Sequence, residues 1–284
     1  MKLIRFGNKG QESPGYLDDS GNRRDLSAFG EDFNQQFFEQ NGIRRLTEWL
    51  DNQQQSLPVV DSHVRWGSPV DTPGKIVCVG LNYSDHAKES GMAIPEEPVL
   101  FFKATSALCG PYDQITIPPG SKKTDWEVEL ALVIGSKARH VSEENSLSHI
   151  AGYTIMNDVS ERAYQLEGTG QWVKGKSYDS FAPLGPYLAT SDEIGNTDNL
   201  NLWLKVNDQF MQQGSTNKLI FKVPFLVSFI SRYMTLMPGD IISTGTPPGV
   251  GAGMKPPQFL KSGDVVELGI EGLGASKQSV VQDT

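Results

Sequence analysis

Apolar and polar positions alternate along short stretches of this chain, and the most informative stretch runs from Asp125 to Ile134. Its sequence, D-W-E-V-E-L-A-L-V-I, is apolar apart from its first residue and two carboxylates, Glu127 and Glu129. Side chains two positions apart on a strand project from the same face, about 7 Å apart along the chain. Apolar residues continue on both faces, so we predict a strand that is buried on both sides and carries two neighbouring acids.

Similar patterns predict a β-rich α+β fold with short elements. Apolar runs and alternation predict strands over residues 2–6, 15–17, 75–80, 99–103 and 153–156, and a hairpin over 199–214. The hairpin is expected to turn at Asn207-Asp208. Apolar residues at helical spacing, with capping signals, predict helices over residues 41–50, 142–149 and 223–234. The 29 glycines and 17 prolines also favour turns and short strands over long helices.

A Pro- and Gly-rich connection, H-V-R-W-G-S-P-V-D-T-P-G, ends just after Pro73. It predicts a division into a small N-terminal α+β domain, residues 1–72, and a main domain, residues 73–284. The alternative is that residues 1–72 are a mere extension, and they contain no recognisable candidate chemistry.

Charge and cysteine content narrow the class of protein. The net charge is −9, from 25 basic and 34 acidic residues, and the basic residues form no block. This argues against nucleic acid or an anionic membrane surface as the main partner. The two cysteines, Cys78 and Cys109, show no metal-binding spacing, so we interpret them as reduced core thiols. With no signal-peptide pattern and no apolar run near 18 residues, a cytoplasmic protein is expected.

The two buried acids are the first candidates for a functional site. Two carboxylates removed from water repel each other, so they should be protonated, hydrogen-bonded or bound to a cation. The predicted strand over 153–156 leads to Asp158, which could deliver a third carboxylate. Three converging carboxylates suit Mg²⁺ or Mn²⁺ before Zn²⁺. In a second interpretation, D-V-S-E is a capping box, and Asp158 caps a helix that extends through Glu167.

A histidine and a glutamate upstream form a candidate proton-transfer pair. His86 and Glu89 lie three apart in a predicted short helix capped by Ser84 or Asp85, so both project from one helical face. A carboxylate beside an imidazole orients the ring and raises its basicity, which suits a general base acting on water. The alternative is an exposed surface pair with no chemical role.

Arg162 and Gln165, one turn beyond Asp158, are candidates for either charge neutralisation or substrate contact, and their spacing favours neither. The Gly/Pro-rich loop after residue 243 contains Thr246, whose hydroxyl could hold a carboxylate together with backbone N–H groups. Equally, this loop could be only a tight turn after the strand, in which glycines adopt positive φ angles.

Residues 170–177, G-Q-W-V-K-G-K-S, match the phosphate-loop pattern G-x-x-x-x-G-K-[ST], which would indicate an NTPase. A phosphate loop follows a buried strand and begins a helix. Here a predicted helix precedes the match, and Pro183 and Pro186 follow it, so we interpret the match as accidental. Lys176 then remains a lone cation on a loop.

Six of these segments, in this order, resemble the fumarylacetoacetate hydrolase family in its smaller bacterial acylpyruvate-hydrolase-like branch. They are V-G-L-N-Y-S-D-H-A-K-E, E-P-V-L-F-F-K, E-V-E-L, N-D-V-S-E-R, K-G-K-S-Y-D and G-D-I-I-S-T-G-T-P-P-G-V-G, spread over residues 75–270. The resemblance implies a mixed β-roll core, a small N-terminal domain and, usually, a homodimer.

The resemblance also implies site roles. Glu127, Glu129 and Asp158 match the positions that bind Mg²⁺ or Mn²⁺. His86 and Glu89 match a water-activating dyad on a short helix that can act as a lid. The positions that match substrate contacts are Arg162, Gln165, Lys176 and Thr246.

The function expected from these residues is metal-dependent hydrolysis of a C–C bond in a 2,4-diketo acid, with pyruvate and a carboxylic acid as products. The substrate class includes acylpyruvates and 2,4-diketo-3-deoxy sugar acids, and Lys176 is expected to stabilise the pyruvate enolate. Alternatives that use the same metal site are oxaloacetate decarboxylation, hydroxyhepta-diene-dioate isomerisation and ureidoglycolate lyase activity. A binding protein that holds the metal without catalysis is a further alternative.

Overall fold

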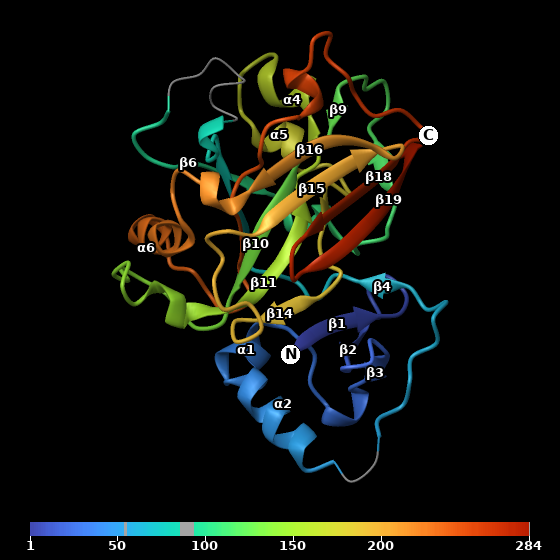
Figure 1. The fold of residues 1–284 in the computed structure, drawn as a ribbon, viewed down its shortest axis with the longest axis vertical. Coiled ribbons are helices and arrows are strands. Elements are labelled where there is room, and N and C mark those ends of the chain that lie inside the picture. Colours follow the sequence, from blue (N-terminus) through green and yellow to red (C-terminus); the bar gives the residue numbers. More distant parts are fainter. Residues whose placement is uncertain (54–55, 86–93, 284) are drawn as a thin grey trace.

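A computed structural model describes residues 1–53, 56–85 and 94–283 (Figure 1). The described part is mostly strands with few helices, arranged in mixed sheets, which confirms the β-rich α+β class. The large sheet has ten strands, nine of them in the order β3-β2-β1-β14-β11-β10-β17-β5-β6, with β4 also paired to β1. These strands are β1 (Lys2–Phe6), β2 (Ser13–Leu17), β3 (Arg23–Asp25), β4 (Trp66–Gly67), β5 (Ile76–Gly80), β6 (Val99–Lys103), β10 (Val128–Ile134), β11 (Ile150–Asn157), β14 (Leu188–Thr190) and β17 (Ile241–Ser243).

The strands β10 and β11 lie in the middle of this sheet and are buried along their whole length. A second sheet of five strands packs across them, in the order β16-β15-β18-β19-β8 (Figure 1). Its members are β8 (Ile115–Ile117), β15 (Asn201–Val206), β16 (Gln209–Ser215), β18 (Val265–Ile270) and β19 (Gly274–Gln282). A strand covered on both faces needs apolar side chains on both, which explains the near-continuous apolar sequence of β10.

Two short strand pairs complete the sheets. They are β9 (Thr124–Asp125) with β12 (Ser160–Glu161), and β7 (Leu108–Cys109) with β13 (Ala182–Pro183). The predicted hairpin is confirmed as β15 and β16. Asn207 and Asp208 both adopt positive φ, 49° and 64°, as a two-residue turn that matches the twist of the strands requires.

The helices are short and lie outside the sheets (Figure 1). Those within the described residues are α1 (Gln35–Glu39), α2 (Gly42–Asp51), α4 (Arg162–Leu166), α5 (Val173–Lys176) and α6 (Val223–Tyr233). The predicted helices over 41–50 and 223–234 are confirmed as α2 and α6. The predicted helix over 142–149 is shortened to a 3₁₀ helix, Ser146–His149, because the chain first makes a turn in which Asn145 N–H donates to the Ser142 carbonyl.

The N-terminal strands extend the large sheet. Strand β1 pairs antiparallel with β14, with Lys2 opposite Ala189 and Leu3 opposite Leu188. The helices α1 and α2 lie beside these strands at one end of the molecule (Figure 1). The domain boundary at residues 72 and 73 stays a prediction.

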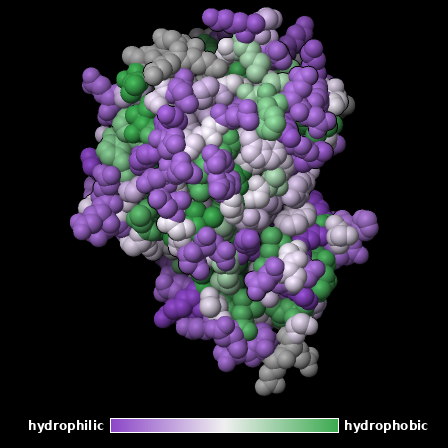
Figure 2. Space-filling view, in the orientation of Figure 1, coloured by the Kyte–Doolittle hydropathy of each residue, from purple (hydrophilic) through white to green (hydrophobic). Residues whose placement is uncertain are grey.

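The surface is mixed in character. On the face shown in Figure 2, polar and apolar side chains are interspersed. No helix in the described ranges is long and apolar enough to cross a membrane.

Candidate metal and substrate site

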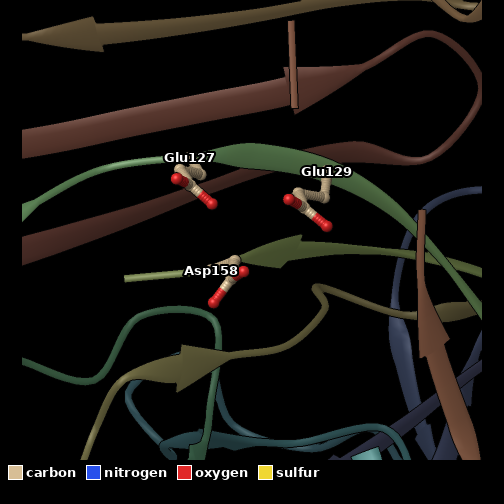
Figure 3. A group of neighbouring side chains, drawn as sticks. All are labelled: Glu127, Glu129 and Asp158. Atoms are coloured by element: carbon tan, nitrogen blue, oxygen red, sulfur yellow. The ribbon is translucent and has the colours of Figure 1, made fainter. Parts of the chain in front are cut away.

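Three acids from neighbouring strands converge at one end of β10 and β11. Glu127 directly precedes β10, Glu129 lies within it, and Asp158 directly follows β11. The antiparallel register places Val128 opposite Asn157, and the Asp158 N–H donates to the Glu127 carbonyl at 2.9 Å. One oxygen of each carboxylate lies within 4.8 Å of the others, and all three side chains are buried. Figure 3 shows the Glu127 and Glu129 side chains on the side of their strand that faces Asp158. The structure therefore brings together Glu127 and Glu129, which the alternation pattern singled out, and Asp158, to which the predicted strand over 153–156 leads.

The capping interpretation of Asp158 is wrong. Residues 160 and 161 are extended and pair with β9, so no helix begins at Asp158. The helix α4 starts at Arg162, and the Glu161 carboxylate caps it by accepting the Ala163 N–H. Asp158 is thus directed to the acidic cluster and not to a helix terminus.

Glu127 is held by two cations. One carboxylate oxygen accepts a hydrogen bond from the Arg162 guanidinium at 2.6 Å, and the other accepts one from Lys176 Nζ at 2.8 Å. Burial alone would raise the pKa of Glu127, but Lys176 and Arg162 lower that pKa to about 2. Glu127 is therefore ionised at neutral pH.

Glu129 lies deeper and faces no bonded cation in the described structure. Its Oε2 accepts from the Ser243 hydroxyl at 2.6 Å and from the Gly245 N–H at 2.9 Å. Burial, together with the charges of Asp158 and Glu127, raises the pKa of Glu129 well above its ordinary value. This repulsion among buried carboxylates is what a bound cation would relieve.

Asp158 lies between two buried lysines, one of which the sequence reasoning missed. Lys176 Nζ donates to Asp158 Oδ2 at 2.7 Å, and Lys103 forms an ion pair with Oδ1 and donates to the Val159 carbonyl at 3.0 Å. Lys103 ends β6 and shares a strand face with the buried Phe101, and this alternation is the signal that would have identified it. Burial lowers the pKa of Lys176, but Asp158 and Glu127 raise it above its ordinary value, so Lys176 is charged.

Asp125 is a second residue that the sequence reasoning missed. It is completely buried and accepts the Arg162 Nε–H at 2.8 Å. It also accepts the backbone N–H groups of Gly251 and Ala252 at 2.7 and 2.9 Å. Asp125 therefore fixes the loop over 246–253 relative to Arg162, which in turn holds Glu127.

The candidate substrate contacts line one pocket together with Glu127 and Glu129. Arg162 donates to Gln165 Oε1 at 2.9 Å, so the two act as a pair. The Thr246 hydroxyl accepts from Gln212 and donates to the Val128 carbonyl, both bonds at 2.8–2.9 Å. The pocket has a volume of about 260 Å³, and Glu127, Glu129, Arg162, Gln165, Lys176 and Thr246 all line it.

The phosphate-loop interpretation of residues 170–177 fails in context. The helix α4 and a turn precede the match, and α5 is a single turn that ends at Lys176. The ammonium of Lys176 is buried against two carboxylates, which leaves it unsuited to a nucleotide phosphate. The same lysine is instead part of the acidic cluster.

The predicted dyad of His86 and Glu89 lies outside the described residues. The chain leading to it is anchored by Asn82, a buried amide four positions before His86. Asn82 Nδ2 donates to the Thr244 carbonyl at 2.8 Å, and Asn82 Oδ1 accepts the Phe221 N–H at 2.8 Å.

The donor set fits a divalent metal. Three buried carboxylates, Asp125, Glu127 and Asp158, form ion pairs with three cations, Lys103, Arg162 and Lys176, and Glu129 adds a fourth buried carboxylate with no ion pair in the described structure. Among the described residues the acids thus exceed the cations by one. An all-oxygen set of this kind suits Mg²⁺ or Mn²⁺.

Comparison with known proteins gives consistent matches. Residues 75–281 match the family model described as "Fumarylacetoacetate (FAA) hydrolase C-terminal". A Burkholderia orbicola protein named "Putative hydrolase Bcenmc03_4750" is 51% identical over 279 residues, which covers 98% of each chain.

Among the solved structures that match over 100% of both chains are two hydrolases. The fumarylacetoacetate hydrolase of Exiguobacterium antarcticum has 36% identity and a TM-score of 0.86. The maleylpyruvate hydrolase of Sphingobium sp. SYK-6, solved with manganese(II) and pyruvate, has 30% identity and a TM-score of 0.82.

Proposed function

This chain belongs to the fumarylacetoacetate hydrolase family, and from that membership we propose that it is a divalent-metal-dependent hydrolase of 2,4-diketo acids. It cleaves a C–C bond and releases pyruvate and a carboxylic acid. The observation that carries the proposal is the buried cluster of Glu127, Glu129 and Asp158, of which Glu127 and Glu129 line the same pocket as Arg162 and Lys176. The manganese and pyruvate in the maleylpyruvate hydrolase structure support it, because pyruvate is the product expected here.

Glu127, Glu129 and Asp158 would hold Mg²⁺ or Mn²⁺, which would supply Lewis-acid chemistry to the bound substrate. The charged Lys176 lies against Glu127 and Asp158, at 2.8 and 2.7 Å, so its positive charge is fixed beside the metal position. A preorganised cation of this kind stabilises negative charge as it develops on the departing pyruvate enolate. Arg162 and Gln165 line the same pocket and orient the substrate.

His86, oriented by Glu89, is the proposed base that removes a proton from the attacking water. This assignment rests on the family resemblance. The role of His86 distinguishes hydrolysis from the decarboxylation of oxaloacetate, because decarboxylation forms the same enolate without an attacking water.

Replacing His86 by alanine is therefore expected to lower the turnover of a diketo acid by about 100- to 10,000-fold, the usual contribution of a general base. Metal affinity should not change. The measurement is the loss of diketo-acid absorbance with Mg²⁺ or Mn²⁺, with oxaloacetate as a second substrate and a chelator as the blank.

The matched control is His63→Ala, because His63 is exposed and lies in the N-terminal part of the chain. If His86→Ala kept diketo-acid turnover, the hydrolytic assignment would be wrong. If the wild-type enzyme consumed oxaloacetate but no diketo acid, this result would favour the decarboxylase alternative.

A further inference from the structure

We propose that the acyl group beyond the 4-keto carbon of the substrate is uncharged and apolar, and that Trp172 limits its size. The inference rests on the proposed function and deepens it, because it names the subclass of diketo acid that the pocket accepts.

The part of the pocket beyond the acids is built from apolar side chains. They come from β5 and the residue after it, from β6, from α4, from the residue before α5 and from the loop before residue 251. These side chains are Val79, Leu81, Phe101, Leu166, Trp172 and Val250. Apolar walls favour an apolar group, since they exclude water without offering hydrogen bonds.

A chain of contacts connects the acidic cluster to this apolar wall. Lys176 Nζ lies over the Phe101 ring, 5.0 Å from its centroid. The Phe101 ring in turn packs edge-on against the Trp172 indole, with 5.3 Å between centroids. A substrate whose keto oxygens lie at the acids therefore meets Phe101 and then Trp172 as it extends.

Among the described lining residues, both cations already form ion pairs with buried carboxylates. The Arg162 guanidinium donates to Asp125, Gln165 and Glu127, and Lys176 donates to Glu127 and Asp158. Within the described residues, no lining cation is therefore left to neutralise a second carboxylate on the acyl group. Burying an unpaired carboxylate against such walls is strongly unfavourable.

Gly80 shows how closely the indole is fitted. A Cβ built on Gly80 would lie 2.6 Å from a ring carbon of Trp172 and 3.1 Å from the next, although the Gly80 backbone itself is compatible with alanine. The indole cannot retreat freely, because Phe101 packs against it. The volume of about 260 Å³ is also small for a ligand pocket, which favours a short acyl group.

The test compares three substrates with the wild-type enzyme and Mn²⁺: acetylpyruvate, hexanoylpyruvate and fumarylpyruvate, the last carrying a second carboxylate. Acetylpyruvate is expected to have the highest kcat/KM, with fumarylpyruvate about 100-fold lower. In Trp172→Phe, hexanoylpyruvate should gain about tenfold relative to acetylpyruvate, because the smaller ring leaves more room. In Gly80→Ala, the kcat/KM of hexanoylpyruvate should fall relative to that of acetylpyruvate, through a higher KM for hexanoylpyruvate. The Mn²⁺ affinity should stay unchanged.

The matched control is Trp203→Phe, since Trp203 lies on the β15–β16 hairpin and does not line the pocket. Equal or faster turnover of fumarylpyruvate by the wild type would overturn the specificity proposal and leave the proposed function standing. An unchanged acyl-length ratio in a folded Trp172→Phe would overturn the role of Trp172. If none of the three acids is consumed while Mn²⁺ binds, the proposed function itself fails and the specificity proposal falls with it.

Discussion

Replacing Glu129 by glutamine is expected to weaken metal binding at the acidic cluster strongly without unfolding the chain. Glu129 is 2% exposed and is repelled by Asp158 and Glu127, which raises its pKa. A glutamine oxygen can still accept the hydrogen bonds of Ser243 and Gly245, while its amide group faces the acids. We therefore expect the free energy of unfolding without metal to be unchanged or higher by about 1 kcal/mol.

The same substitution removes a metal ligand, so Mn²⁺ affinity should fall at least about 100-fold and turnover about 1000-fold. Titration calorimetry with Mn²⁺ and thermal unfolding with and without the metal measure both effects. Glu167→Gln is the control, because Glu167 is exposed and pairs only with Lys123 in the described contacts. A strongly destabilised Glu129→Gln, or one that still binds Mn²⁺ normally, would contradict the assignment of this cluster.

Replacing Lys176 by methionine is expected to separate metal binding from catalysis. The Lys176 side chain is 2% exposed, and its ammonium bonds Glu127 and Asp158, so its loss leaves two buried carboxylates with one cationic partner each. Stability without metal should fall by about 3 kcal/mol. Metal affinity should rise, because a positive charge that repels the metal has been removed. Turnover should fall about 100- to 1000-fold through kcat, since the enolate charge loses its nearby cation.

Chemical denaturation, Mn²⁺ titration and steady-state kinetics on the same samples test these three effects. Lys174→Met is the matched control, because Lys174 lies on the same short helix but is exposed and bonds only Thr169 in the described contacts. Should Lys176→Met retain kcat, or bind Mn²⁺ more weakly, its proposed role would be wrong.

Local patterns predict the parts of this structure that depend on near neighbours. The alternation through β10 predicts that Glu127 and Glu129 share one face, and the Asn207-Asp208 pair predicts a hairpin turn. The convergence of Asp158 with these acids was predictable because a strand leads directly to it.

The residues that bond the acids are harder to predict from local sequence patterns. Lys103 reaches Asp158 across 55 positions, and Asp125 reaches Gly251 across 126. These contacts depend on the order of strands in the sheet, which alternation along one strand does not encode. The capping box failed for the same reason: pairing of β12 with β9, set by distant residues, outcompeted the helix that D-V-S-E favours locally.

Pairing of β1 with β14 likewise joins Lys2 to Ala189, so the N-terminal strands extend the sheet that carries the site. The division at residue 72 and the homodimer remain predictions. Light scattering of the intact chain tests the second.

The most direct test of metal-dependent hydrolysis is product analysis of acetylpyruvate in ¹⁸O-labelled water with Mn²⁺, followed by mass spectrometry. The proposed chemistry predicts equal amounts of pyruvate and acetate, with at least one ¹⁸O atom in the acetate carboxylate and no products when the metal is chelated. The proposed chemistry would be contradicted if the acetate were unlabelled or if the products formed equally well with chelator. It would also be contradicted if the metal-loaded protein cleaved no diketo acid.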